Sequence, residues 1–309
     1  MSLQVALYVL NVVLNTLIIA LDILIIWAAI TSGEIRRNLI LHIIITAMVM
    51  DIAVYMNTIL HDIPSFIMDN DFTVPELRYA SVLILCSQWF SQLLFLPVLS
   101  VIHFLAIFSP TNFRSISNKH VYGANIAIVM FGFLMTVPLF TEYCGYTYLT
   151  DGHYWYFDFK KPYTYLYHSV NLWLQGFCVV VVVVIDALII WKVFRLRSSA
   201  NKSRILAVSG QASKKPTMTT KKYRLGREAR LALNFLMLSV CFLVMTICFN
   251  VIGGYGMWQD LAMKLSSNLN LSKWAVYALG NPVIRYKILQ LFGIVNAQYF
   301  ARTSFVTKT

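Results

Sequence analysis

The stretch QVALYVLNVVLNTLIIALDILIIWAAI, residues 4–30, decides the class of fold, because it carries a single charged side chain, Asp22. A helix crosses the hydrocarbon core of a bilayer with about 20 mostly apolar residues. Six further apolar stretches follow, at about 39–60, 80–108, 121–141, 164–191, 231–256 and 268–292. The sequence therefore predicts an all-α bundle of seven transmembrane helices, with the whole chain, residues 1–309, as a single domain.

The overall composition agrees with a membrane protein that crosses the bilayer several times. Hydrophobic residues make up 59% of the chain and charged residues only 12%, about half the usual share of a globular protein. A soluble domain could not solvate such a surface, and a disordered chain needs more charge. Five cysteines are too few for a disulfide-stabilised scaffold.

The seventh stretch has the weakest signal, because only eleven uncharged residues lie between Lys273 and Arg285. It spans a membrane if both long basic side chains reach toward the lipid surfaces. We therefore expect Lys273 to extend outward and Arg285 to extend inward, away from the apolar centre.

The distribution of basic residues predicts the orientation. With the N-terminus outside, 20 of the 25 Lys and Arg residues fall in the segments 31–38, 111–120, 192–230 and the tail from 285. This bias fits the positive-inside rule, so we expect the C-terminus in the cytoplasm. The formal charge of +12 then needs no nucleic-acid partner. The basic loop 192–230 is expected to contact anionic lipid, and it also suits docking of a cytosolic partner.

Three carboxylates lie within the predicted spans: Asp22, Asp51 and Asp186. Such residues are costly in lipid and normally face the bundle interior. Asp22 and Asp51 lie at similar depth on adjacent antiparallel helices, and Asn281, just before Pro282, lies at that depth too. Two interpretations remain open: a small hydrated site that binds sodium, or a protonated Asp51 hydrogen-bonded to its neighbours. Asp186 lies near a helix end, where we expect it to reach solvent.

These positions carry a resemblance to a known family. TAMVMD, residues 46–51, HFLAIFSP, residues 103–110, and the NP pair at 281–282 resemble motifs of rhodopsin-like G-protein-coupled receptors. AIFSP and the segment REARLALNF, residues 227–235, are most similar to nematode serpentine chemoreceptors. The resemblance implies a chemosensory receptor in the plasma membrane, without enzymatic activity or cofactor. Its implied partners are a small-molecule ligand and a heterotrimeric G protein.

The chain departs from the family pattern at several positions. Where the family has an acid, an arginine and an aromatic residue, this chain has Ile102, His103 and Phe104. Arg285 stands where the seventh-helix motif has tyrosine, and Tyr286 comes one position late. The family's arginine stabilises the inactive state, so the resemblance implies that this state is less stable in a chain with His103 at that position. An opsin is disfavoured, because Ala275 stands where its Schiff-base lysine would lie.

The resemblance places a ligand between the third, fifth, sixth and seventh helices. Leu85 occupies the position where amine receptors carry a carboxylate, so an amine ligand is disfavoured. The expected pocket is neutral and aromatic, for a small neutral or weakly polar ligand. Its candidate residues are Cys86, Gln88, Trp89, Gln92, Phe249, Trp274 and Tyr277. The alternative for each aromatic residue is ordinary packing between helices or in an interfacial belt.

The remaining expectations concern the two surfaces of the bundle. The aromatic loop Tyr143–Tyr167 is either a lid over the pocket or an interfacial belt, and its Cys144 has no obvious partner unless the loop dips toward Cys86. The residues implied in G-protein coupling are His103, Arg114, Lys222, Arg227 and Tyr286.

Three other functions are alternatives to this one. A bitter-taste-like receptor is an alternative, since GNP at 280–282 resembles that group. A transporter should show two similar halves, which the sequence lacks. A membrane enzyme is disfavoured, because no two of the six histidines have the i, i+4 spacing of a zinc site and no GxSxG motif occurs.

Overall fold

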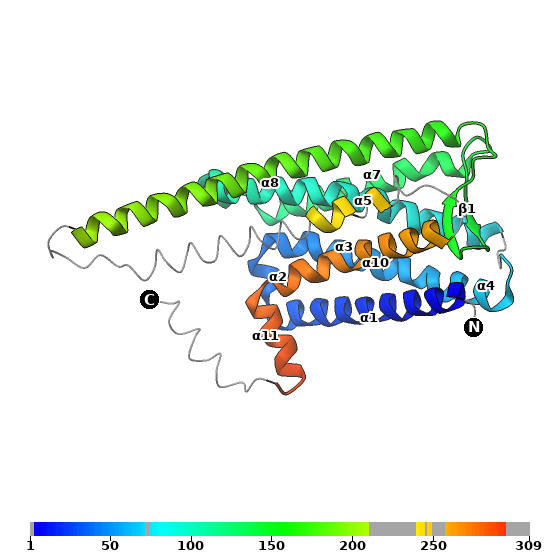
Figure 1. Ribbon diagram of the computed structural model, residues 1–309, viewed down its shortest axis with the longest axis horizontal. Coiled ribbons are helices and arrows are strands. Elements are labelled where there is room, and N and C mark those ends of the chain that lie inside the picture. Colours follow the sequence, from blue (N-terminus) through cyan, green and yellow to red (C-terminus); the bar gives the residue numbers. More distant parts are fainter. Residues whose placement is uncertain (1–2, 72–74, 210–238, 245, 249–256, 295–309) are drawn as a thin grey trace.

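A computed structural model describes residues 3–71, 75–209, 239–244, 246–248 and 257–294. The chain forms an elongated bundle of helices with one small β-hairpin at an end (Figure 1). The predicted sixth stretch, 231–256, lies mostly outside the described residues, which include helical turns at 239–244 and 246–248.

Five helical segments are long and apolar enough to cross a membrane. Helix α1 covers Leu3–Thr31, and the second segment joins α3 (Leu39–Asn57), the π-helical turn η1 (Thr58–Asp62) and α4 (Ile63–Met68). Helix α5 covers Pro75–Phe108. Helix α7 (Asn118–Thr136) continues into the 3-10 turn η2 (Val137–Phe140), and α8 covers Thr164–Ser209. Short helices α2 (Glu34–Arg37) and α6 (Pro110–Ser115) connect neighbouring segments. These helices overlap the first five predicted stretches.

The seventh helix differs from the predicted 268–292. Helix α10 covers Met257–Leu279, and a separate helix, α11, covers Pro282–Leu291. The break falls at Asn281, whose backbone is extended and whose side chain accepts a hydrogen bond from the amide of Val283 at 2.9 Å. Because Pro282 has no N–H to donate, a new helix starts there, and α11 turns away from the axis of α10 (Figure 1).

Helix α8 is longer than predicted. Its 46 residues correspond to about 69 Å, which exceeds a bilayer of about 45 Å with its headgroups. The first part of the predicted loop 192–230 is therefore helical, and α8 projects beyond the rest of the bundle (Figure 1). Asp186 of this helix is buried and accepts a hydrogen bond from Ser239, so the expectation that it reaches solvent is wrong.

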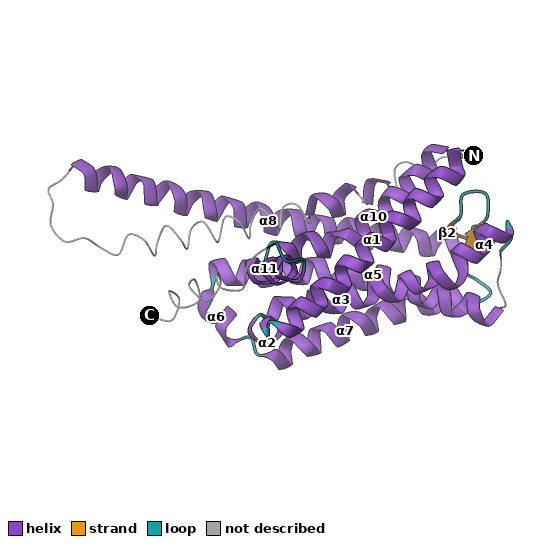
Figure 2. Ribbon diagram, turned by 90° about the horizontal axis from the view of Figure 1, so that it is seen from below, coloured by secondary structure: helices purple, strands orange, loops and turns teal. Residues whose placement is uncertain are grey.

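Helix α5 lies at the centre of the bundle and packs against α3, α7 and α8 (Figure 2). Its buried face includes Leu93, Phe95, Leu96 and Leu99. The approach of α7 to α5 is close at Gly132, where a Cβ atom would lie 2.3 Å from Ser91 Oγ. Small residues allow such close packing between membrane helices.

The close contact at Gly132 predicts that Gly132→Leu destabilises the bundle. The new side chain would force α5 and α7 apart, which costs about 1–3 kcal/mol or more. We expect a lower thermal denaturation midpoint of the purified protein. Gly123→Leu on the same helix is the matched control, since a Cβ there meets nothing within 4 Å. Equal midpoints for the two variants would contradict the close contact.

One end of the bundle carries the hairpin, which is formed by β1 (Tyr146–Leu149) and β2 (Tyr154–Phe157). The strands are antiparallel, with Tyr146 opposite Phe157 and Leu149 opposite Tyr154. The start of α1 lies at the same end, called the hairpin end below, while α11 lies at the opposite end, called the α11 end (Figure 1).

Candidate functional site

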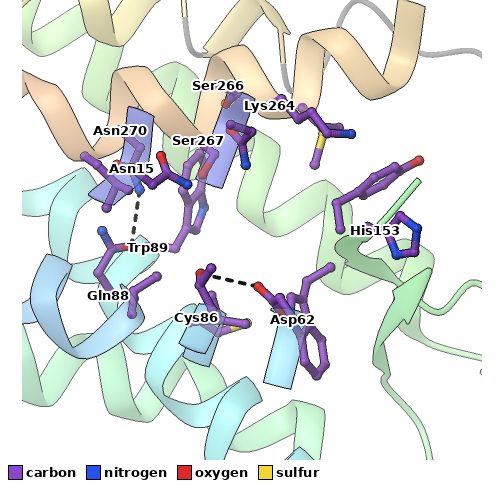
Figure 3. Close-up of a pocket in the computed structure, with 18 of the residues that line it drawn as sticks. Asn15, Asp62, Cys86, Gln88, Trp89, His153, Lys264, Ser266, Ser267 and Asn270 are labelled. Carbon is purple, nitrogen blue, oxygen red and sulfur yellow. Dashed lines mark hydrogen bonds between the residues drawn. The ribbon is translucent and has the colours of Figure 1, made fainter. Parts of the chain in front are cut away.

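A cavity of about 170 Å³ lies beneath the hairpin. The described lining comes from α1, the second helical segment, α5, α10 and the hairpin, with Tyr167 from the start of α8. Figure 3 shows Gln88 and Asn270 on one side of this cavity and Asp62 and His153 on the other. The cavity therefore lies closer to the first, second and seventh helices than the predicted position between the third, fifth, sixth and seventh.

The hairpin covers the cavity, which favours the lid interpretation of the aromatic loop. Residues Tyr146, His153, Tyr154, Trp155 and Phe157 all line the cavity. Burial raises the pKa of Tyr146 and Tyr148 well above that of free tyrosine. Burial, together with the charge of Lys264, lowers the pKa of His153. The lid thus presents uncharged aromatic groups to the cavity at neutral pH.

Three side chains attach the hairpin to the helices. Arg78 donates a hydrogen bond to Thr147 Oγ1 at 2.6 Å, and Trp155 Nε1 donates to Asp62 Oδ1 at 3.0 Å. Lys264 donates to the carbonyl oxygen of Gly152 at 3.1 Å. Each bond reaches a different strand or the turn between them, so the lid is held at several points.

The π-helical turn η1 places an acidic group at the cavity. Such turns occur frequently at functional sites because they redirect side chains. His61, which is fully buried, has Nδ1 2.9 Å from Asp62 Oδ1 and Nε2 3.1 Å from Asp71 Oδ1. Each ring nitrogen of His61 therefore lies within hydrogen-bond distance of a carboxylate, and His61 links Asp62 to Asp71.

The inner side of the cavity is built from polar side chains of α5 and α10. Trp89 Nε1 donates to Asn171 Oδ1 of α8 at 2.9 Å. Gln88 accepts a hydrogen bond from Asn270 at 3.3 Å and donates one to Asp51 at 2.6 Å. Gln88 therefore connects the cavity directly to the polar centre of the bundle.

That centre is organised around Asp51, which is fully buried. Gln92 Nε2 donates to Asp51 Oδ1 at 2.8 Å, and Gln92 also accepts a hydrogen bond from the indole of Trp274. Two amides from successive turns of α5 thus hold one carboxylate oxygen. The other, Asp51 Oδ2, has no hydrogen-bond partner among the described residues.

Lys273 lies in the same polar centre, so the expectation that it extends toward the lipid surface is wrong. Its side chain is fully buried and donates to the carbonyl and side-chain oxygens of Asn270. Its ammonium group interacts electrostatically with both Asp51 and Asp22. Neither carboxylate oxygen of Asp22 has a hydrogen-bond partner among the described residues. The hydrogen bonds to Asn270 and the attraction of Asp51 and Asp22 offset part of the cost of burying this charge.

The predicted ligand residues fall into successive layers. Cys86, Gln88 and Trp89 line the cavity. Gln92 and Trp274 lie one layer deeper, around Asp51. Tyr277 is further away, because its hydroxyl forms a 2.6 Å hydrogen bond with Nε2 of the buried His103. The predicted ligand residue Phe249 lies outside the described residues.

The residues predicted for the sodium site and for G-protein coupling also lie on different elements. Asn281 caps α11 and is not among the side chains bonded to Asp51, so sodium binding by Asp51, Asp22 and Asn281 stays a prediction. Arg114 lies on α6 and Tyr286 on α11, whereas Lys222 and Arg227 lie outside the described residues. Cys86 and Cys144 are buried free thiols.

Sequence reasoning missed several residues that line the cavity. They are Tyr8, Asn15, Asp62, His153 and Lys264. A signal for α1 was present, because Tyr8, Asn11 and Asn15 recur at helical spacing in an otherwise apolar stretch. No comparable signal marks Asp62 or His153, since a π-helical turn and a folded-back hairpin bring them to the cavity.

Comparisons with protein-family models and with curated proteins find no match. Among solved structures, squid rhodopsin matches with a TM-score of 0.74. The match covers 94% of this chain and 82% of the rhodopsin chain, at 13% sequence identity. The chain has the seven-helix fold of rhodopsin. This fold confirms the predicted all-α, seven-helix class, and together with the apolar helices it describes a multi-pass membrane protein.

Proposed function

We propose that this protein is a G-protein-coupled chemosensory receptor of the plasma membrane. It binds a small neutral or weakly polar ligand in the cavity at the hairpin end and signals to a heterotrimeric G protein at the α11 end. The rhodopsin fold supports the receptor class. The narrower chemosensory assignment is supported by the sequence segments AIFSP and REARLALNF, and a bitter-taste-like receptor is the alternative within this class.

The observation that carries this proposal is a hydrogen-bonded chain that leads from the cavity into the bundle. Asn270 and Gln88 line the cavity, and Gln88 bonds to Asp51, which Gln92 links to Trp274. A ligand that changes the partners of Gln88 also changes those of Asp51. Such a ligand shifts the helix packing if it binds one arrangement better than the other.

The coupling surface is proposed at the end that carries α11 and the projecting part of α8. With the N-terminus outside, this end faces the cytoplasm, in agreement with the basic residues of 192–230. His103 of α5, Arg114 of α6 and Tyr286 of α11 belong to this half of the molecule, and we include Lys222 and Arg227 in the proposal on their sequence alone. Contact with anionic lipid is expected on the same side.

Two cations are candidates to balance the carboxylates of Asp51 and Asp22. One is a bound sodium ion, and the other is the ammonium group of Lys273. The ammonium group of Lys273 interacts with both Asp51 and Asp22, which is the role a bound sodium ion would have. Replacement of external sodium by an organic cation separates the two. A ligand potency that depends on sodium and is altered in Asp51→Asn supports the sodium site, and an unchanged potency supports Lys273 as the cation.

The topology is tested by epitope tags at the two ends of the chain, stained with and without permeabilisation. The expected result is an N-terminal tag accessible on intact cells and a C-terminal tag accessible only after permeabilisation. Two tags on the same face would contradict the receptor proposal. A ligand screen with a second-messenger readout then tests signalling, and uptake of a compound without any second messenger would indicate a transporter.

Trp89→Ala should lower ligand potency at least about tenfold. The substitution removes an aromatic wall of the cavity and the hydrogen bond to Asn171, and losses of 1.4 kcal/mol correspond to a factor of ten. Second-messenger dose–response curves measure the effect, with surface expression as the folding control. Trp173→Ala on α8 is the matched substitution, because Trp173 is 80% exposed and does not line the cavity, and it should leave potency unchanged.

A further inference from the structure

The cavity face of α1 carries a row of polar side chains. Tyr8, Asn11 and Asn15 all line the cavity and follow one another at spacings of three and four residues, which places them on one face of a helix. In an otherwise apolar transmembrane helix, this row has to find its hydrogen-bond partners inside the protein or in a ligand.

Two of these three residues carry a polar atom without a partner. Tyr8 and Asn15 are each 4% exposed, and among the described residues neither the Tyr8 hydroxyl nor Asn15 Oδ1 has a hydrogen-bond partner. Asn11 differs, because its Oδ1 accepts a hydrogen bond from Asn268 at 2.6 Å. Leaving a buried polar atom without a partner is costly, so these two atoms favour a ligand that supplies the missing hydrogen bonds.

The charged side chains at the cavity are already paired. Lys264 bonds to Asp260 and to the carbonyl of Gly152. Asp62 accepts hydrogen bonds from Trp155 and is paired with His61. A charged ligand would have to displace these partners, whereas an uncharged ligand leaves them in place.

The size of the cavity and the spacing of the two residues along α1 define the ligand further. A volume of about 170 Å³ is close to that of an engineered cavity of about 150 Å³ that binds benzene. Tyr8 and Asn15 are separated by two helical turns, about 10 Å along the axis. One ring with polar atoms at opposite ends suits both constraints. Asn15 Oδ1 requires an N–H or O–H donor, and the Tyr8 hydroxyl can donate to an acceptor.

We propose that α1 selects the ligand: Asn15 accepts a hydrogen bond from one end of an uncharged single-ring molecule, and Tyr8 donates to an acceptor at its other end. This inference rests on the proposed function, since it names the ligand class of the same cavity. It assigns a binding role to the first helix, which the sequence-based candidate residues did not include.

The test uses the purified full-length protein in nanodiscs and three probes. 4-Hydroxyacetophenone carries a donor and an acceptor at opposite ends of one ring, acetophenone lacks the donor, and 4-ethylphenol lacks the acceptor. We expect 4-hydroxyacetophenone to bind about tenfold more tightly than either analogue, as the loss of one hydrogen bond to a buried group implies. Equal affinities of the three probes, or no binding of 4-hydroxyacetophenone, would overturn the inference.

Substitutions assign each end of the probe to a residue. Asn15→Leu should abolish the preference over acetophenone, and Tyr8→Phe should abolish the preference over 4-ethylphenol. Asn118→Leu and Tyr122→Phe on α7 are matched controls, because neither residue lines the cavity. If Asn15→Leu does not fold, Asn15→Ser keeps a polar group but shortens its reach and should lose the same preference. Preferences that survive in both α1 variants would contradict the assignment.

The binding measurement separates this inference from the proposed function, because it needs no G protein. Probe binding with the expected preferences but without any second-messenger response would contradict the receptor function alone. A receptor that responds to other ligands, with potencies unchanged in Tyr8→Phe and Asn15→Leu, would contradict the α1 selection alone.

Discussion

Lys273→Met should lower the free energy of unfolding by about 1–3 kcal/mol, the usual cost of leaving buried hydrogen-bonding groups without their partner. Lys273 is fully buried, and its charge interacts with Asp51 and Asp22. Methionine has a similar length but no charge, so the substitution leaves two buried carboxylates without their cation. The effect should appear as a large drop in the thermal denaturation midpoint of the purified protein and as reduced surface expression.

A second substitution shows whether charge is the cause. Adding Asp22→Asn to Lys273→Met should recover about 1 kcal/mol or more, because the double variant contains one fewer uncompensated carboxylate. Lys160→Met, at an exposed position of the loop that follows β2, is the control and should change stability by no more than about 0.5 kcal/mol. A Lys273→Met protein as stable as the unmodified chain would contradict the buried ionic cluster.

Gln88→Leu should lower both stability and ligand potency, because Gln88 belongs to the cavity wall and to the polar centre. The substitution removes the 2.6 Å hydrogen bond to Asp51 and the 3.3 Å bond from Asn270. A hydrogen bond to a charged group contributes about 1.5–3 kcal/mol to stability. We expect a corresponding fall in the denaturation midpoint and a loss of ligand potency of about tenfold in the second-messenger assay.

Gln92→Leu is the matched substitution for this prediction. Gln92 donates to the same oxygen of Asp51 at 2.8 Å but is not among the residues that line the cavity. Its loss should therefore destabilise the protein to a similar degree while ligand affinity, measured by direct binding, changes little. If both variants weaken binding equally, Gln88 acts only through the stability of the centre, and its proposed contact with the ligand is wrong.

The layout of the helices could be predicted because each transmembrane helix satisfies its own backbone hydrogen bonds. Length and hydrophobicity therefore locate the apolar segments without knowledge of their neighbours. Length and hydrophobicity do not locate the ends of the helices as well. Pro282 ends the seventh helix earlier than expected, and α8 continues to Ser209, because termination depends on capping and not on hydrophobicity.

The candidate site was predicted only in part. Cys86, Gln88 and Trp89 were identified from their place on the third helix and do line the cavity. The sequence predicts Trp274 and Tyr277 as pocket walls, but they bond to Gln92 and His103 in deeper layers. Helical spacing indicates which residues share a face, whereas their depth and rotamer depend on what packs against them.

The sequence by itself determined that the chain crosses the membrane as a helical bundle, because the bilayer imposes length and hydrophobicity on each segment separately. It also identified Asp22 and Asp51 as residues that need a partner inside the bundle. Only the tertiary structure decided that Lys273 is a partner, that the hairpin covers the cavity and that α1 presents Tyr8 and Asn15 to it. Each of these contacts joins residues that are far apart in the sequence, so it forms only when the helices pack together.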